Sequence, residues 1–180
     1  MTPVVPDLHD EVIVLRPPNE GDIDPITAAV QDPDIPRFTR IPSPYRRADA
    51  VTFVERAQEG WRSGTSRDLM ICDARHTRLL GGVGLHSGAH PRVLEIGYWV
   101  DANARRRGIA TRAVRLLSTW AINHLELQRL ELMTHVDNVA SQGVAARAGF
   151  TREGVLRSYA TIGCGLADVV MFSLLPSDLV

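Results

Sequence analysis

The chain has few cysteines, little net charge and no long hydrophobic run, and each shortage excludes a class of protein. Its 180 residues include two cysteines, Cys72 and Cys164, which are too few for a secreted disulfide framework and too far apart for a metal-binding knuckle. We expect both thiols to be reduced. The net charge of -1 creates no overall field that would recruit nucleic acid or an anionic membrane. The sequence therefore predicts neither a metal site nor a nucleic-acid partner.

Hydrophobic residues are plentiful but dispersed. No run approaches the roughly 20 apolar residues that a membrane-spanning helix needs, and the N-terminus shows neither the basic region nor the apolar core of a signal peptide. We therefore expect a cytoplasmic protein without a membrane partner. A content of 44% hydrophobic and 23% charged residues is typical of a globular domain. The length favours a single domain over residues 1–180, with the proline-containing residues 1–10 flexible.

The stretch from Leu94 to Leu117 is the most informative part of the sequence. An apolar strand leads into a turn with three successive arginines, and Gly108 then opens an amphipathic helix. The N-H groups in the first turn of a helix lack intrahelical partners and lie at the positive end of its dipole, so they can bind a phosphate. Arginine side chains can add charged donors to the same oxygens. Spacing alone leaves a second interpretation open, an ordinary helix start with solvated arginines.

Periodicity predicts a mixed α/β fold with a largely antiparallel sheet flanked by helices. Alternating or apolar runs bounded by turn residues indicate strands, whereas apolar residues at helical spacing indicate helices. Four prolines between residues 33 and 48 predict an irregular connection between the first two helices. The expected strands are 11–16, 69–72, 79–85, 93–100, 130–136, 150–159 and 168–174, and the expected helices cover 21–30, 49–61, 108–123 and 138–148.

Several ordered segments resemble one enzyme family. Arg105–Ala110 is similar to the pyrophosphate loop, Arg/Gln-x-x-Gly-x-Gly/Ala, of the GCN5-related N-acetyltransferases (GNAT). Asn138–Ser141, followed by Ala148–Phe150 and Glu153–Gly154, resembles the later signature of the RimJ/RimL-like branch, which acetylates the N-termini of ribosomal proteins. Asp168–Leu175 looks like the last strand of that branch.

The resemblance implies a GNAT-like sheet in which the two central strands, 93–100 and 130–136, splay apart. An acyl-pantetheine arm could pair with the backbone groups exposed there, as an added strand would. The implied cosubstrate is acetyl-CoA, although another acyl-CoA remains possible, and no metal is implied. The residues implied to bind it are Tyr98, Trp99, Val100, Arg105, Arg106, Arg107, Gly108, Ile109, Ala110, Thr111, Asn138 and Ser141.

Glu95 is the candidate general base. Strand alternation places Glu95 on one face with Gly97 and Trp99, while Tyr98 belongs to the opposite face. Only a neutral amine attacks a thioester, and a carboxylate shielded from water can accept the proton of an ammonium near neutral pH. The family resemblance implies this role for a glutamate on the central strand, often acting through water. The alternative is a partly exposed strand residue without a catalytic role.

Ser141 is the candidate proton donor to the departing thiolate. Many relatives have a tyrosine seven residues after the asparagine, whereas this chain has Ala145 there. The resemblance therefore leaves Ser141, solvent or Tyr159 to protonate the thiolate. The alternative for Asn138 and Ser141 is that they simply begin the following helix.

The resemblance implies an acyl-CoA-dependent N-acyltransferase that works by direct attack on the thioester. The resemblance favours a protein or peptide N-terminal amine as the acceptor, with Arg37, Phe38 and Tyr45 either meeting substrate or packing within their loop. His86 could titrate near neutral pH if it lies close to an amine. A small-molecule amine, such as an amino acid, polyamine or aminoglycoside, is an alternative acceptor. A non-catalytic acyl-CoA sensor and a homodimer also remain open.

Overall fold

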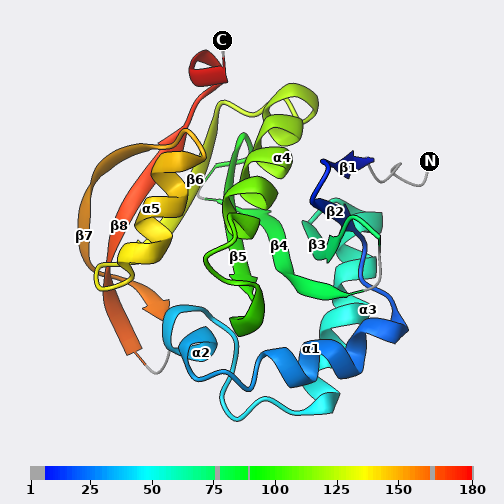
Figure 1. Ribbon diagram of the computed structural model, residues 1–180. Coiled ribbons are helices and arrows are strands. Elements are labelled where there is room, and N and C mark those ends of the chain that lie inside the picture. The colour runs from blue at the N-terminus through cyan, green and yellow to red at the C-terminus, as the bar shows by residue number, and fades with distance from the viewer. Residues whose placement is uncertain (1–6, 76–77, 89, 163–164, 180) are drawn as a thin grey trace.

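The computed structural model describes residues 7–75, 78–88, 90–162 and 165–179 and shows one eight-stranded sheet in the order β1-β2-β3-β4-β5-β6-β8-β7 (Figure 1). The pairing of β5 with β6 is parallel, and the other six pairings are antiparallel. This confirms the predicted fold class. The strands are β1 (Leu8–His9), β2 (Ile13–Arg16), β3 (Ser66–Asp73), β4 (Leu79–Ser87), β5 (Val93–Val100), β6 (Arg129–His135), β7 (Thr151–Ile162) and β8 (Gly165–Leu174).

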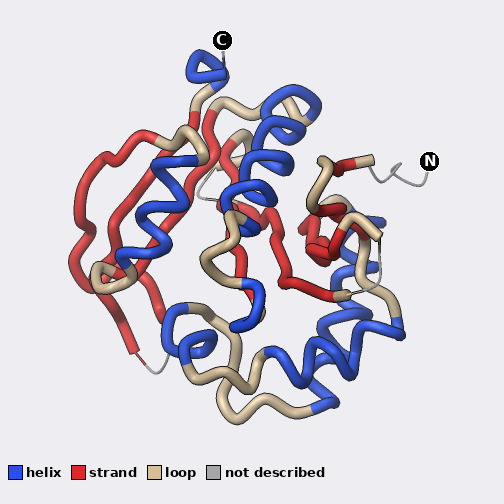
Figure 2. Tube along the Cα trace, in the orientation of Figure 1, coloured by secondary structure: helices blue, strands red, loops and turns tan. Residues whose placement is uncertain are grey.

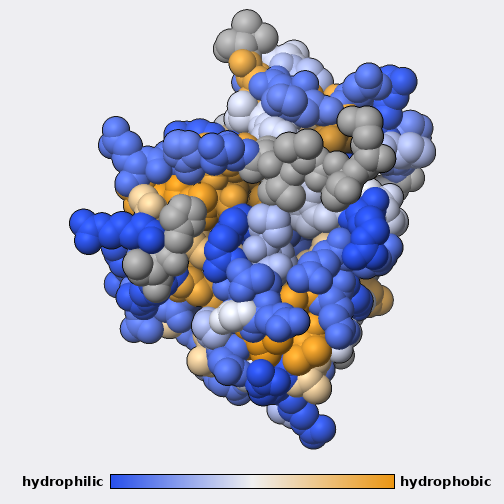
Figure 3. All heavy atoms as spheres, turned by 90° about the vertical axis from the view of Figure 1, so that its right-hand side faces the viewer, coloured by the Kyte–Doolittle hydropathy of each residue, from blue (hydrophilic) through white to orange (hydrophobic). Residues whose placement is uncertain are grey.

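Helices pack against both faces of the sheet (Figures 1 and 2). The α-helices are α1 (Ile23–Ala29), α2 (Asp34–Phe38), α3 (Arg47–Ser63), α4 (Ile109–His124) and α5 (Val139–Arg147), and the 3-10 turns are η1 (Glu20–Asp22), η2 (Ala102–Ala104) and η3 (Pro176–Leu179). Among the described residues, none of these helices is long and apolar enough to cross a membrane. Seen from the side of β1 and α3, the surface is mostly hydrophilic, with hydrophobic residues in separate patches (Figure 3).

Two hydrophobic clusters separate the faces of the sheet. On one face, α4 buries Ile109, Ala113 and Leu117 against the sheet at a spacing of four residues. On the other face, helices α1 and α3 pack on residues that include Met70 and Cys72. The Cys72 thiol is free and buried, and burial raises its pKa. Cys164 lies outside the described residues.

The structure corrects the prediction at the N-terminal end of the chain. Residues 1–10 were expected to be flexible, but Leu8 and His9 pair with Leu15 and Val14 as strand β1. Leu8 is also buried, so its burial supports this short pairing. Residues 1–6 lie outside the described part of the chain.

The proline-containing connection is more regular than predicted. It contains the five-residue helix α2, and α3 starts at Arg47 rather than at Asp49. Proline is tolerated in a first helical turn because the N-H groups there have no intrahelical acceptor. Asp49 still supports the start of α3, since its Oδ2 accepts a hydrogen bond from the Arg46 N-H at 2.7 Å.

The two central strands separate as the resemblance implies. Strands β5 and β6 are paired only where Val93–Glu95 lies opposite Arg129–Glu131. Beyond that point β6 continues to pair with β8 up to His135, and β5 continues to pair with β4 up to Val100. The edge of β5 beyond Glu95 that faces β6 is therefore open, and Glu95 stands where the strands part.

Candidate active site

A cavity of about 1050 Å³ opens where β5 and β6 diverge. Residues Ile96–Val100 of β5 and Leu132–Thr134 of β6 contribute to its walls. Loops and helices from both faces of the sheet complete the lining, so the cavity extends from the α4 and α5 side to the α1, α2 and α3 side. Such a passage can bring two substrates together from opposite faces of the sheet.

The cavity ends at the first turn of α4 on one side. Gly108 precedes this helix with φ 75°, and Arg106 has φ 59°, so two left-handed residues shape the loop. The N-H groups of the first helical turn have no acceptor within the helix. This loop fits a pyrophosphate. Its members that line the cavity are Arg105, Arg106, Gly108, Ile109, Ala110 and Thr111.

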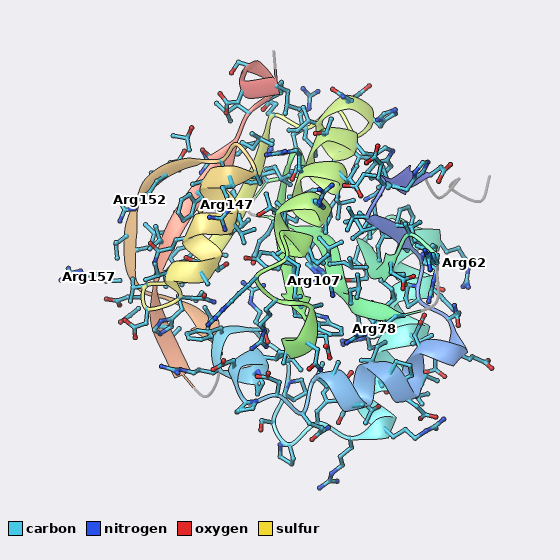
Figure 4. The ribbon with its side chains drawn as sticks, in the orientation of Figure 1. Arg62, Arg78, Arg107, Arg147, Arg152 and Arg157 are labelled. Atoms are coloured by element: carbon cyan, nitrogen blue, oxygen red, sulfur yellow. The ribbon has the colours of Figure 1, made fainter. Side chains whose placement is uncertain are left out.

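The three predicted arginines differ in their surroundings. The Arg105 guanidinium donates to the Val100 carbonyl at 3.3 Å and also lies 3.2 Å from Asp32, so it ties the loop to the protein. Arg106 lines the cavity, whereas Arg107 lies at the N-terminal end of α4 outside the cavity lining (Figure 4). Arg147, which the sequence analysis did not single out, lines the cavity from α5. The cationic side chains that line this end are therefore Arg105, Arg106 and Arg147.

A partly buried pair of hydroxyl groups lies on the α4 and α5 side of the strands. The Tyr98 hydroxyl is 2.7 Å from Ser141 Oγ, and Asn138 Oδ1 accepts the Ser141 N-H at 3.0 Å. Burial raises the pKa of Tyr98 to about 12, although hydrogen bonding to Ser141 and the charge of Arg147 act in the opposite direction. The phenol therefore remains protonated near neutral pH.

Neither Tyr159 nor Ala145, the residue at the position of the tyrosine of many relatives, lines the cavity. Ala145 is fully buried and lies outside the cavity lining, while Tyr159 is 54% exposed on β7 and is also outside it. Tyr159 thus lies apart from the cavity, and the identity of the proton donor stays a prediction. Tyr98 from β5 places a phenol beside Ser141 instead.

The cavity also holds a buried hydroxyl without a partner. Thr134 is 2% exposed on β6, and its hydroxyl has no hydrogen-bond partner among the residues that the structure describes. Buried polar groups are normally hydrogen-bonded, so this group fits a polar ligand between the strands. An amide of a pantetheine arm has this chemistry.

On the opposite face, Glu95 meets an arginine that the sequence analysis missed. Its Oε2 accepts a hydrogen bond at 3.1 Å from Arg40, which belongs to the segment between α2 and α3. The Glu95 side chain is 18% exposed and lines the cavity, as expected of a base that meets substrate. The Glu95 carboxylate therefore has a positively charged partner in the cavity.

His86 lies next to Glu95, and Asp68 lies next to His86. His86 on β4 is directly opposite Glu95 in the strand register, and its Nε2 is 3.4 Å from Oδ1 of Asp68 on β3. Gly84 lies opposite Asp68, and a Cβ at position 84 would overlap the Asp68 carboxylate. The glycine therefore allows the carboxylate and the imidazole to approach each other.

The three residues predicted to meet the acceptor, Arg37, Phe38 and Tyr45, differ in their positions relative to the cavity. Phe38 and Tyr45 line the cavity, and burial raises the pKa of Tyr45 to about 12. Arg37 lies outside the lining and places its guanidinium over the Phe38 ring, 4.8 Å from the centroid. Phe38 in turn contacts the ring of His135 on β6.

The residues that the sequence analysis missed share one property. Arg40, Asp68 and Arg147 come from different elements, and their approach to the cavity depends on how the chain folds. The sequence offered one signal, because Asp68 is a carboxylate directly before the apolar run Leu69–Cys72. No local pattern marks Arg40, because its relation to Glu95 spans 55 residues.

Comparisons with known proteins agree with this geometry. The family described as "Acetyltransferase (GNAT) domain" matches residues 13–151. The putative ribosomal N-acetyltransferase YdaF of Bacillus subtilis (strain 168) is 38% identical over 101 residues, which cover 56% of this chain and 55% of YdaF. The alignment thus spans about half of that relative.

Two solved structures share the fold. The microcin C7 self-immunity acetyltransferase MccE, in complex with acetyl-CoA and AMP, has a TM-score of 0.82 and 24% identity, covering 92% of this chain and 93% of its own. The ribosomal L7/L12 α-N-protein acetyltransferase RimL, in complex with coenzyme A, has a TM-score of 0.83 and 20% identity. The match covers 94% of this chain and 98% of the RimL chain. Because the family match covers most of the chain, the chain belongs to the GNAT N-acetyltransferase family.

Proposed function

We propose that the protein transfers an acetyl group from acetyl-CoA to a primary amine, preferably the α-amino group of a protein or peptide. The observation that carries the proposal is the position of Glu95 at the point where β5 and β6 part. A thioester held between the strands would lie beside this carboxylate. A non-catalytic acyl-CoA sensor would not need an ionisable group at that position.

The α4 and α5 side suits acetyl-CoA. The first turn of α4, with Arg106 and Arg147, would bind the pyrophosphate, because helix N-termini and guanidinium groups both favour phosphate oxygens. The unpartnered hydroxyl of Thr134 would serve the pantetheine arm. The likeness to MccE with acetyl-CoA and to RimL with coenzyme A supports this placement.

Glu95 and Ser141 would act on opposite sides of the reacting carbon. Glu95 accepts a proton from the substrate ammonium, directly or through water, and the neutral amine then attacks the thioester carbonyl. The C-N bond forms, the C-S bond breaks and Ser141 gives its proton to the departing thiolate. Tyr98, hydrogen-bonded to Ser141, replaces that proton or holds the hydroxyl in position.

The charges on the acceptor side favour a substrate with a single ammonium group. The carboxylates of Asp49, Asp68 and Glu95 line this side together with the guanidinium groups of Arg40 and Arg56. A polyamine or aminoglycoside would need an excess of negative charge to offset its several cations. The ribosomal N-acetyltransferase name of YdaF also favours a protein N-terminus.

The test measures thiol release from acetyl-CoA with peptides that have free or blocked N-termini and with small amines. The sequence contains no lysine, so the enzyme offers acetyl-CoA no lysine amine of its own. We expect turnover with peptides that have a free N-terminus and no turnover with peptides whose N-terminus is blocked. The kcat of Glu95→Gln should be about 100-fold lower than that of wild type. Glu55→Gln, on the exposed surface of α3, is the matched control. Tight binding of acetyl-CoA without turnover on any amine would contradict the proposal.

A further inference from the structure

The proposed reaction leaves a role on the acceptor side for a proton acceptor besides Glu95. An ammonium has three N-H bonds and a secondary amide has one, so two protons leave nitrogen. Glu95 accepts the first proton, which makes the amine nucleophilic. The second proton leaves after attack, when the nitrogen of the tetrahedral intermediate is positively charged. A second acceptor within reach of the same nitrogen would complete this step.

His86 lies in the position that such a group needs. It is the cross-strand partner of Glu95 in the antiparallel pairing of β4 with β5, which places both side chains on one face with Cβ atoms about 5 Å apart. Both residues line the same cavity. The His86 side chain is 44% exposed, so it is accessible to a substrate and to water.

Asp68 holds this imidazole from the neighbouring strand. Its Oδ1 is 3.4 Å from His86 Nε2, and its Oδ2 accepts a hydrogen bond at 3.0 Å from Ser66 Oγ. The Asp68 side chain is 16% exposed, which strengthens its effect on a neighbouring positive charge. With Asp68 beside Nε2, Nδ1 has no hydrogen-bond partner among the described residues.

Four other charged or titratable groups surround His86 and Glu95. Arg40 is bound to Glu95, so Glu95 already carries a positive partner before substrate arrives. From α3 and the segment before it, Tyr45, Asp49 and Arg56 line the same side of the cavity. Imidazole is the commonest general acid-base group in enzymes, which suits a group that must accept a proton and then release it to solvent.

We propose that His86 is a catalytic residue that accepts the second proton, and that Asp68 is its positioning residue. The inference rests on the proposed function. As the C-N bond forms, the nitrogen becomes positively charged, and its proton moves to an imidazole nitrogen of His86. The C-S bond then breaks, the electron pair leaves with sulfur, and Ser141 protonates the thiolate. Glu95 and His86 later return their protons to water, and Ser141 regains one, so that one proton is released per turnover.

The primary test compares His86→Gln with wild type across a range of pH. We expect kcat to fall about 100-fold, within the range for loss of an acid-base group, while acetyl-CoA binding and the melting temperature remain unchanged. The acidic limb of the wild-type kcat profile should also disappear. His90→Gln, an exposed change outside the cavity lining, should retain wild-type kcat.

Two further variants separate catalysis from packing. His86→Ala should regain activity when imidazole is added to the assay, and Asp68→Asn should lower kcat while leaving the KM for the peptide unchanged. An unchanged kcat and pH profile in His86→Gln would overturn the inference while leaving the proposed function intact. A wild-type protein that turns over no amine would instead refute the proposed function.

Discussion

Removal of the Tyr98 hydroxyl tests the hydroxyl pair on the acetyl-CoA side. In Tyr98→Phe, Ser141 Oγ loses a partner at 2.7 Å while the ring continues to fill its partly buried position. A hydrogen bond of this kind contributes about 1 kcal/mol to stability, so unfolding in urea should become easier by that amount. If Ser141 depends on Tyr98 for its proton or its orientation, loss of about 1.4 kcal/mol from transition-state stabilisation lowers kcat about tenfold.

The assay is thiol release at saturating acetyl-CoA and peptide. The KM for acetyl-CoA should stay within twofold of wild type, because the hydroxyl pair is proposed to act on the leaving group. Tyr159→Phe, an exposed tyrosine on β7, is the matched control and should keep full activity. Because burial raises the pKa of Tyr98 to about 12, its ionisation should not limit the rate below about pH 10. A kcat for Tyr98→Phe equal to that of the control would refute this reasoning.

Three other changes have defined outcomes. Hydrogen bonds from Arg129 hold the pKa of Glu153 at about 2, below its usual 4.5, so their stabilisation is present above about pH 4.5 and is lost as the pH falls towards 2. Because Glu153 is 40% exposed, Glu153→Gln should cost only about 1 kcal/mol at pH 7 and less at pH 3, as urea unfolding would measure. Gly108→Ala places a side chain at φ 75°, so it should lower the free energy of unfolding by about 1 kcal/mol, as thermal unfolding would measure. It should also raise the KM for acetyl-CoA. Arg40→Ala removes the half-exposed guanidinium that pairs with Glu95, so Glu95 is free to bind the ammonium of the peptide. The KM for the peptide should therefore fall about threefold, with little change in stability.

The central strand and the loop after it were predictable because their signals are local. The strand at Val93–Val100 and the helix start after Gly108 agree with the structure, and so does the alternation that puts Glu95 and Tyr98 on opposite faces. Gly149, with φ 96°, follows α5 as expected of a residue at a helix C-terminus. In each case a few adjacent residues determine the backbone conformation.

The parts that escaped prediction depend on tertiary contacts. Strand β1 has two residues and becomes visible only through its pairing with β2. The short helix α2 follows a proline-rich signal that equally suits a loop. Asp68 and His86 are 18 residues apart in the sequence, and they meet only because β3 and β4 are paired. Gly163, which lies between the last two predicted strands, falls outside the described residues.

The most direct test of the account is the pH dependence of peptide acetylation by Glu95→Gln, measured as initial thiol release beside wild type. If Glu95 removes the proton from the ammonium, the variant must rely on amine that is already neutral in solution. Its kcat/KM should then rise about tenfold per pH unit below the pKa of the peptide amine, of about 8, and approach wild type above it. A kcat/KM for Glu95→Gln that remains equal to wild type at pH 6 to 7 would contradict the assignment of Glu95 as the base.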